Sequence, residues 1–110
     1  PTTSMRMDAF TPRLLRYGVN AMIGKGERGE AVRAAIMETG AVYFAAIGGC
    51  AAYMAACVEA LEVVAYDDLG TESIKRLTVR DLPLTVALDA QGGDAYAMGA
   101  ERYRELCQNP

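Results

Sequence analysis

Apolar and polar residues alternate along this chain in segments whose period switches between that of a helix and that of a strand. Short continuous apolar runs are typical of strands, whereas apolar residues three or four apart indicate one face of a helix. The pattern predicts helices over residues 8–17, 27–39, 50–58 and 95–106, and strands over residues 19–23, 41–47, 61–66, 74–79 and 84–88. Residues 67–73 are expected to form a turn or a single helical turn.

Three of the predicted helices carry large apolar side chains at helical spacing. The first has Phe10, Leu14 and Tyr17 on one side, the second turns Val32, Ala35 and Ile36 inward, and the last carries Tyr96, Tyr103 and Leu106. Glycine commonly ends a helix, so Gly18 and Gly40 are natural stops.

The order of these segments predicts an α/β fold. Strand–helix alternation in the first half implies right-handed crossovers and a largely parallel sheet. The later strands are joined by short links and can pair differently, so the sheet is expected to be mixed. A chain of 110 residues makes one domain at most.

Charge is spread unevenly. Residues 1–33 hold six basic and three acidic side chains and so carry +3, whereas residues 34–110 hold five basic and eleven acidic ones and carry −6, within a net charge of −3. This asymmetry is either scatter on a solvated surface or a local positive field around an anion site. The basic residues form no dense run with aromatic residues, which argues against a nucleic-acid partner. No apolar run approaches the ~20 residues that span a bilayer, so no membrane partner is expected.

Cysteine and histidine usage narrows the chemistry. Three cysteines without a CxxC pair favour a reducing, cytoplasmic compartment over a disulfide scaffold. Cys50 and Cys57 lie seven apart and are expected to pack as buried small apolar residues on one helix face. The chain has no histidine, which excludes a histidine metal cluster, so proton transfer must use other side chains, water or a partner.

Two short segments carry the candidate chemistry. Residues 2–7 combine hydroxyl groups with Arg6, whose guanidinium can bind a carboxylate through paired hydrogen bonds. The second is Gly24-Lys25-Gly26, which falls between a predicted strand and helix, where α/β sheets bind ligands. Its glycines let the backbone approach a ligand closely and Lys25 adds a charge, although the phosphate-loop pattern GxxxxGK[ST] is absent. Both segments suit a small anionic substrate.

Other polar or glycine-rich segments have a structural explanation. Gly48-Gly49 is explained equally well by a tight turn and by a ligand loop. The pair Asp67-Asp68 can bind a cation, but such residues more often cap a helix or start a turn. Asp89, before the Gly92-Gly93 loop, is interpreted in the same way.

Four segments resemble one known family in the same order along the chain. Residues 1–8 (PTTSMRMD) resemble the GPTT-x-x-RMD signature of the β part of iron–sulfur class I fumarases and L(+)-tartrate dehydratases, with the leading glycine missing. IGKG at residues 23–26, AVYFAAIGG at 41–49 and VAYDDLGTESI at 64–74 resemble further segments of that family. Together they identify the chain as similar to this β part. Since the family's β part extends upstream of GPTT and the chain begins at Pro1, residues 1–110 are expected to be a domain fragment.

The resemblance implies a fold, an activity and a set of partners. The fold would be a β/β/α swivelling domain, and the activity would be a hydro-lyase that interconverts fumarate and (S)-malate. A 4Fe-4S cluster would be ligated by the α part, not by this chain, and one iron without a cysteine ligand would act as Lewis acid. The partner would be an α subunit or domain, in a dimer or heterotetramer that binds a dicarboxylate.

The resemblance also implies roles for individual residues. Thr2 and Thr3 match the threonine pair implicated in proton transfer, and Arg6 and Lys25 match the residues that hold substrate carboxylates. Gly24 and Gly26 would form the substrate loop around Lys25. TTSMRM, including Met5, resembles tartrate dehydratases, whereas the DLGTE segment resembles fumarases, so fumarate is favoured and tartrate is the alternative. A non-catalytic α/β module that uses the anion pocket for regulation or assembly is the alternative from another class, and a truncated product without activity is a further one.

Overall fold

The computed structural model describes residues 4–108, which form two compact units. Among the described residues, the first unit comprises residues 4–47 and 84–108, and the second comprises Gly48–Pro83. Within the described residues, no helix is both long and apolar enough to cross a membrane.

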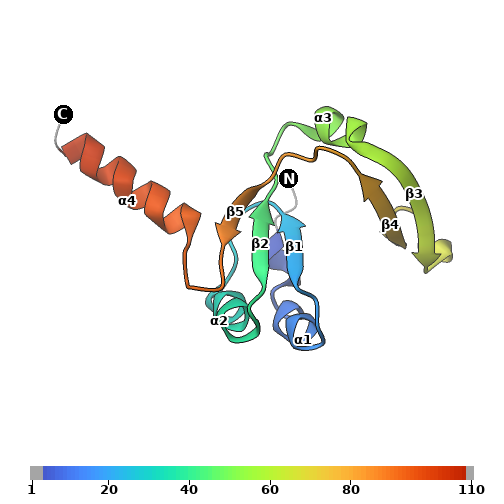
Figure 1. Cartoon of the computed structure of the whole chain (residues 1–110), viewed down its shortest axis with the longest axis horizontal. Coiled ribbons are helices and arrows are strands. Elements are labelled where there is room, and N and C mark those ends of the chain that lie inside the picture. The colour runs from blue at the N-terminus through green and yellow to red at the C-terminus, as the bar shows by residue number, and fades with distance from the viewer. Residues whose placement is uncertain (1–3, 109–110) are drawn as a thin grey trace. The chain divides into compact units, whose positions relative to one another are not determined.

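The first unit is built on a three-stranded mixed sheet (Figure 1). Its strands are β1 (Ala21–Gly24), β2 (Val42–Ala45) and β5 (Thr85–Leu88), in the order β1-β2-β5. β1 and β2 are parallel, with Ala21 opposite Val42, whereas β5 is antiparallel to β2. Its helices are the 3-10 turn η1 (Ser4–Met7), α1 (Thr11–Arg16), α2 (Glu30–Thr39) and α4 (Ala95–Gln108). The mixed α/β class predicted from the pattern is therefore confirmed.

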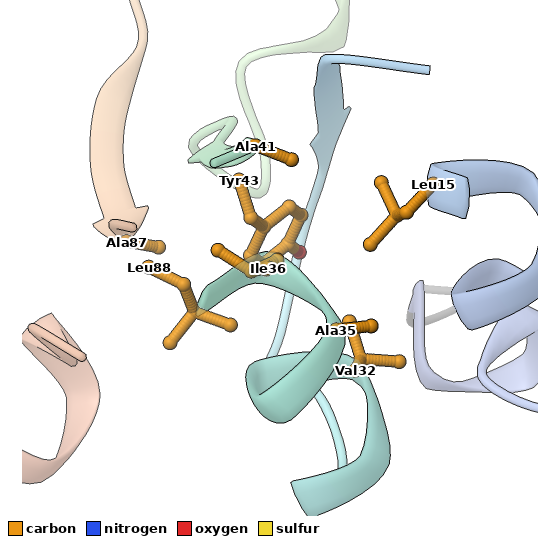
Figure 2. Packing of buried hydrophobic residues seen from close by; sticks show 8 residues of the cluster. All are labelled: Leu15, Val32, Ala35, Ile36, Ala41, Tyr43, Ala87 and Leu88. Carbon is orange, nitrogen blue, oxygen red and sulfur yellow. The ribbon is translucent and has the colours of Figure 1, made fainter. Parts of the chain in front are cut away.

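The hydrophobic core of this unit lies between α2 and the sheet, with Leu15 of α1 beside it (Figure 2). Val32, Ala35 and Ile36 are at most 1% exposed, which confirms the predicted inward face of α2. They pack with Tyr43 of β2, and the cluster is completed by Leu15, Ala41, Ala87 and Leu88. Gly40 ends α2 at a φ of 73°, a conformation that glycine adopts without strain.

The first helix is shorter than predicted and presents a different face. Pro12 lies in its first turn, where a missing N–H costs nothing, and the helix begins at Thr11 instead of residue 8. Thr11 and Leu15 are buried one turn apart. Phe10, Leu14 and Tyr17, expected on one side of the helix, are 62%, 45% and 74% exposed. In α4, Tyr96 is half-buried, but Tyr103 and Leu106 are exposed.

The second unit is an antiparallel hairpin of β3 (Val58–Ala65) and β4 (Ile74–Val79), joined by the 3-10 turn η2 (Asp67–Glu72) and preceded by α3 (Ala51–Ala56). The expectation that strand–helix alternation would bring the third strand into the parallel sheet is wrong. The turn η2 returns the chain directly after β3, and a short connection of this kind joins antiparallel neighbours. β3 pairs instead with the next strand along the chain.

The cysteine prediction is half right. Cys57 is buried, and its sulfur lies 3.4 Å from the carbonyl oxygen of Tyr53. Cys50 is exposed, because it precedes α3 in a non-helical conformation and so does not share a helix face with Cys57. All three cysteines are free, and Cys107 is also exposed.

Candidate functional site

The structure brings the two segments with candidate chemistry into direct contact. The Ser4 N–H donates to the carbonyl oxygen of Lys25 at 3.0 Å, and the Lys25 N–H donates back to Ser4 Oγ at 3.0 Å. Arg6 lies in the same 3-10 turn as Ser4. Thr2 and Thr3 lie outside the described residues. The segment carrying Arg6 is thus fixed against the loop carrying Lys25.

The two glycines on either side of Lys25 are each required by the local structure, for different reasons. A Cβ atom on Gly24 would overlap Ser4 Oγ and lie 3.3 Å from the Tyr43 hydroxyl oxygen, so a side chain at this position would require Ser4 to move. Gly26 has a φ of 85°, in the left-handed region that favours glycine. These constraints account for the spacing of the Gly24-Lys25-Gly26 loop without reference to a ligand.

Tyr43 supports the loop from the core. Its ring is fully buried, yet its hydroxyl oxygen lies 3.1 Å from Ser4 Oγ and 2.9 Å from the carbonyl oxygen of Gly26. A phenol has one proton and a carbonyl oxygen can only accept, so Tyr43 donates to Gly26 and the Ser4 hydroxyl donates to Tyr43. Sequence reasoning placed Tyr43 only in a strand. A tyrosine within a buried apolar run was the available signal, because a buried hydroxyl needs a partner.

A buried ion pair joins the other end of the N-terminal segment to the residues after the loop. Arg28 Nε donates to Asp8 Oδ1 at 2.7 Å, and the two side chains are 3% and 18% exposed. Asp8 Oδ2 also accepts from the Gly29 N–H at 2.5 Å, and Arg28 donates to Thr11 Oγ1 at 2.8 Å. The guanidinium carbon lies 5.0 Å from the centre of the Tyr43 ring. Neither Asp8 nor Arg28 was predicted as a site residue from its own chemistry.

Tyr96 reaches the same region from the first turn of α4. It packs against the core cluster, and burial raises the pKa of its phenol above the usual value. Neighbouring Tyr43 also raises this pKa, while a hydrogen bond with the Gly26 backbone partly opposes the rise. Asp94 fixes this turn, because Oδ1 accepts from the Tyr96 N–H at 2.9 Å and Oδ2 binds Arg33 at 2.6 Å. Tyr96 therefore stays protonated at neutral pH.

The two candidate cations differ in their surroundings. Arg6 is exposed and Lys25 is half-buried. Neither side chain forms a salt bridge or hydrogen bond with another residue in the range 4–108. Among the same residues, Arg28 and Arg33 are paired with carboxylates.

The remaining polar and glycine-rich segments lie in turns of the backbone. Asp89 Oδ1 accepts from the N–H groups of Gln91 and Gly93 at 2.9 and 2.8 Å, which confirms its predicted role in a turn. Asp67 and Asp68 lie in the first turn of η2, but no side chain caps that turn. A Cβ atom on Gly48 or Gly49 would meet nothing within 4 Å.

No group of three or more cysteine, aspartate or glutamate side chains within residues 4–108 is arranged to hold a metal ion. The described residues therefore do not offer a ligand set that fits an iron–sulfur cluster.

One known family matches most of this chain. The family described as Fumarase C-terminus matches residues 1–99, and the chain therefore belongs to that family. The predicted resemblance is confirmed at this level. The match includes both segments that meet at Ser4 and Lys25.

The similar proteins include fumarate hydratases and a tartrate dehydratase subunit. An anaerobic class I fumarate hydratase of Escherichia coli is 38% identical over 98 residues, which cover 87% of this chain and 18% of the relative. Mitochondrial fumarate hydratase 1 of Leishmania major is 34% identical over the same length, with 87% and 18% covered. A protein of Methanocaldococcus jannaschii, named as the beta subunit of L(+)-tartrate dehydratase, is 36% identical over 100 residues, with 87% and 51% covered. The chain thus spans only part of each relative.

Proposed function

We propose that this chain supplies substrate-binding groups to an iron–sulfur hydro-lyase that interconverts fumarate and (S)-malate by reversible addition of water. Fumarate is a dicarboxylate and needs two cationic contacts. In this proposal Arg6 and Lys25 each bind one carboxylate, and the Gly24-Lys25-Gly26 backbone lines the substrate. The observation that carries the proposal is the paired hydrogen bonding of Ser4 with Lys25, which joins the two cationic segments.

Proton transfer is assigned to Thr2 or Thr3. A threonine hydroxyl is a poor base unaided, so a neighbouring charge or a partner residue must assist it. The absence of histidine from the chain supports a proton route through hydroxyl groups. Tyr96 keeps its proton at neutral pH and so does not compete as a base.

The proposed enzyme is completed by an α subunit or domain. That part would ligate the 4Fe-4S cluster, which would supply Lewis-acid chemistry when bound. The likeness to a protein named as the beta subunit of L(+)-tartrate dehydratase supports a separate α partner. The chain alone is expected to be inactive.

The proposal is tested by Arg6→Ala and Lys25→Ala in the complete enzyme, formed with the α part. Loss of a charged substrate clamp is expected to lower kcat/KM for fumarate by at least ~100-fold. Arg102→Ala is the matched control, because Arg102 is an exposed arginine in α4 and outside the site. Near-normal hydration by Arg6→Ala would remove Arg6 from the site.

L(+)-tartrate dehydration is the second candidate, supported by the beta-subunit relative. The ratio of kcat/KM for fumarate to that for L(+)-tartrate decides between the two substrates. If the complete assembly hydrates or dehydrates no dicarboxylate, the anion pocket of a non-catalytic module becomes the better explanation.

A further inference from the structure

The N-terminal segment is attached to the Lys25 loop at two separate points. At the first, Ser4 exchanges two hydrogen bonds with Lys25. At the second, one carboxylate, that of Asp8, binds both Arg28 Nε and the Gly29 N–H. Arg6 lies between these points, and Lys25 is itself part of the first. The backbone positions of both cations are therefore set by the same contacts.

Tyr43 links the two attachment points inside the protein. Its hydroxyl contacts Ser4 and the Gly26 carbonyl at the first point, and its ring lies against the Arg28 guanidinium of the second. A chain of hydrogen bonds therefore runs from the Lys25 N–H through the Ser4 and Tyr43 hydroxyl groups to the Gly26 carbonyl oxygen. Every donor in this chain of hydrogen bonds has an acceptor.

The chemistry of these contacts suits a role in fixing the geometry of the two segments better than a role in stability. Burying an ion pair such as Asp8–Arg28 costs desolvation, and apolar residues of similar volume often give equal or greater stability. A buried, directional pair does fix geometry, because each partner has few acceptable orientations.

We infer that Ser4, Asp8, Arg28 and Tyr43 are positioning residues that set the placement of Arg6 relative to Lys25 before substrate arrives; this inference rests on the proposed function. Pre-organised groups bind a ligand without the entropic cost of ordering them. Without these contacts, ordering would be completed only on binding, so KM would rise. Once substrate is bound the cations are in place, and kcat would change little.

Tyr43→Phe isolates the hydroxyl, since it keeps the buried ring and the contact with Arg28. In the complete enzyme it is expected to raise KM for fumarate about five- to tenfold, with kcat within about twofold of wild type. In the 110-residue chain, exchange of the Lys25 amide hydrogen with solvent is expected to become about tenfold faster. Tyr103→Phe, on an exposed residue of α4, should change neither quantity.

Ser4→Ala provides a second variant outside the hydrophobic core. It removes the acceptor of the Lys25 N–H and a partner of Tyr43 and should reproduce both effects. If Tyr43→Phe unfolds the chain, Ser4→Ala decides the question. Wild-type KM and wild-type Lys25 exchange in a folded variant would overturn the inference, and so would accelerated exchange with unchanged KM. Failure of the proposed function is recognised separately, because Arg6→Ala would then leave hydration unchanged while Lys25 exchange still reports on the contacts.

Discussion

The two units of this chain contain similar apolar strands but bury them to different extents. In the first unit, Ile36 and Tyr43 are fully buried between a helix and a sheet. In residues 48–83, all of which the structure describes, Cys57 is the one buried apolar residue. Leu61 and Leu77 face each other across the hairpin and are 57% and 50% exposed. The hydrophobic cluster and the paired candidate segments both belong to the first unit.

This difference shows which part can hold a site rigidly. Removing apolar surface from water is the main source of folding free energy, about 25 cal/mol per Å². A two-stranded hairpin buries little of its surface and is marginal by itself. A substrate clamp needs a supporting shell with fixed side chains, which Tyr43 and Arg28 provide in the first unit.

The largest expected contrast is between Ile36→Ala and Leu61→Ala. Ile36 is 0% exposed, so its truncation leaves a cavity and should lower the free energy of unfolding by about 2–5 kcal/mol. Leu61→Ala removes an exposed side chain and should change it by about 0.5 kcal/mol or less. Urea unfolding measures the change in the free energy of unfolding for each variant. Amide hydrogen exchange in β2 and β3 then shows which unit has lost stability. Equal losses would show that the hairpin is covered in solution.

A smaller contrast is expected between Gly24→Ala and Gly48→Ala. The new methyl group at position 24 would overlap Ser4 Oγ, which must then leave the Lys25 N–H. Overpacking of this kind costs about 1–3 kcal/mol. At position 48 an added Cβ meets nothing. Thermal unfolding and the amide chemical shift of Lys25 measure both effects, and an unshifted Lys25 amide in Gly24→Ala would contradict the close approach.

The smallest effect concerns the exposed pair Arg16–Glu38, whose side chains are 56% and 55% exposed. The hydrogen bond and charge of Arg16 lower the pKa of the Glu38 carboxyl below its ordinary value of 4.5. Because the folded pKa is the lower one, the stabilisation is present above pH 4.5 and is lost as the pH falls through the folded value. Solvent and salt screen an exposed ion pair, so its contribution to the free energy of unfolding is small whichever unit contains it.

The Glu38 prediction is checked by NMR titration of its carboxyl carbon. The pKa should rise toward the ordinary value in Arg16→Met, and 1 M salt should reduce the difference between the variant and the wild type. Arg76→Met, at a comparably exposed pair in the hairpin, serves as the control and should leave the Glu38 titration unchanged. A Glu38 titration that is insensitive to Arg16→Met would show that the pair does not form in solution.

Local structure could be predicted well because it depends on neighbouring residues. The spacing of Val32, Ala35 and Ile36 predicted the inward face of α2, and this face is confirmed. The predicted strand over residues 74–79 coincides with β4 (Ile74–Val79). The face of the first helix was predicted wrongly because Phe10 and Tyr17 flank the helix as its caps, and the residues that it buries are Thr11 and Leu15.

The supporting residues of the candidate site could not be predicted in the same way. Asp8 and Arg28 are twenty residues apart, and nothing in their local sequence pairs them. Arginine and aspartate are usually exposed, so their burial depends on a partner that only folding supplies. Tyr43 gave a signal, a hydroxyl in an apolar run, but its acceptor at Gly26 lies in a different element.

The sequence by itself therefore determined the order of the helices and strands, the inward face of α2 and the motifs shared with the fumarase C-terminus family. These properties follow from periodicity and residue type within a few positions of the chain. Only the tertiary structure decided that β5 joins β2, that β3 pairs with β4, and that Ser4 meets Lys25. Such long-range contacts depend on which surfaces exclude water together and on which buried polar groups find partners.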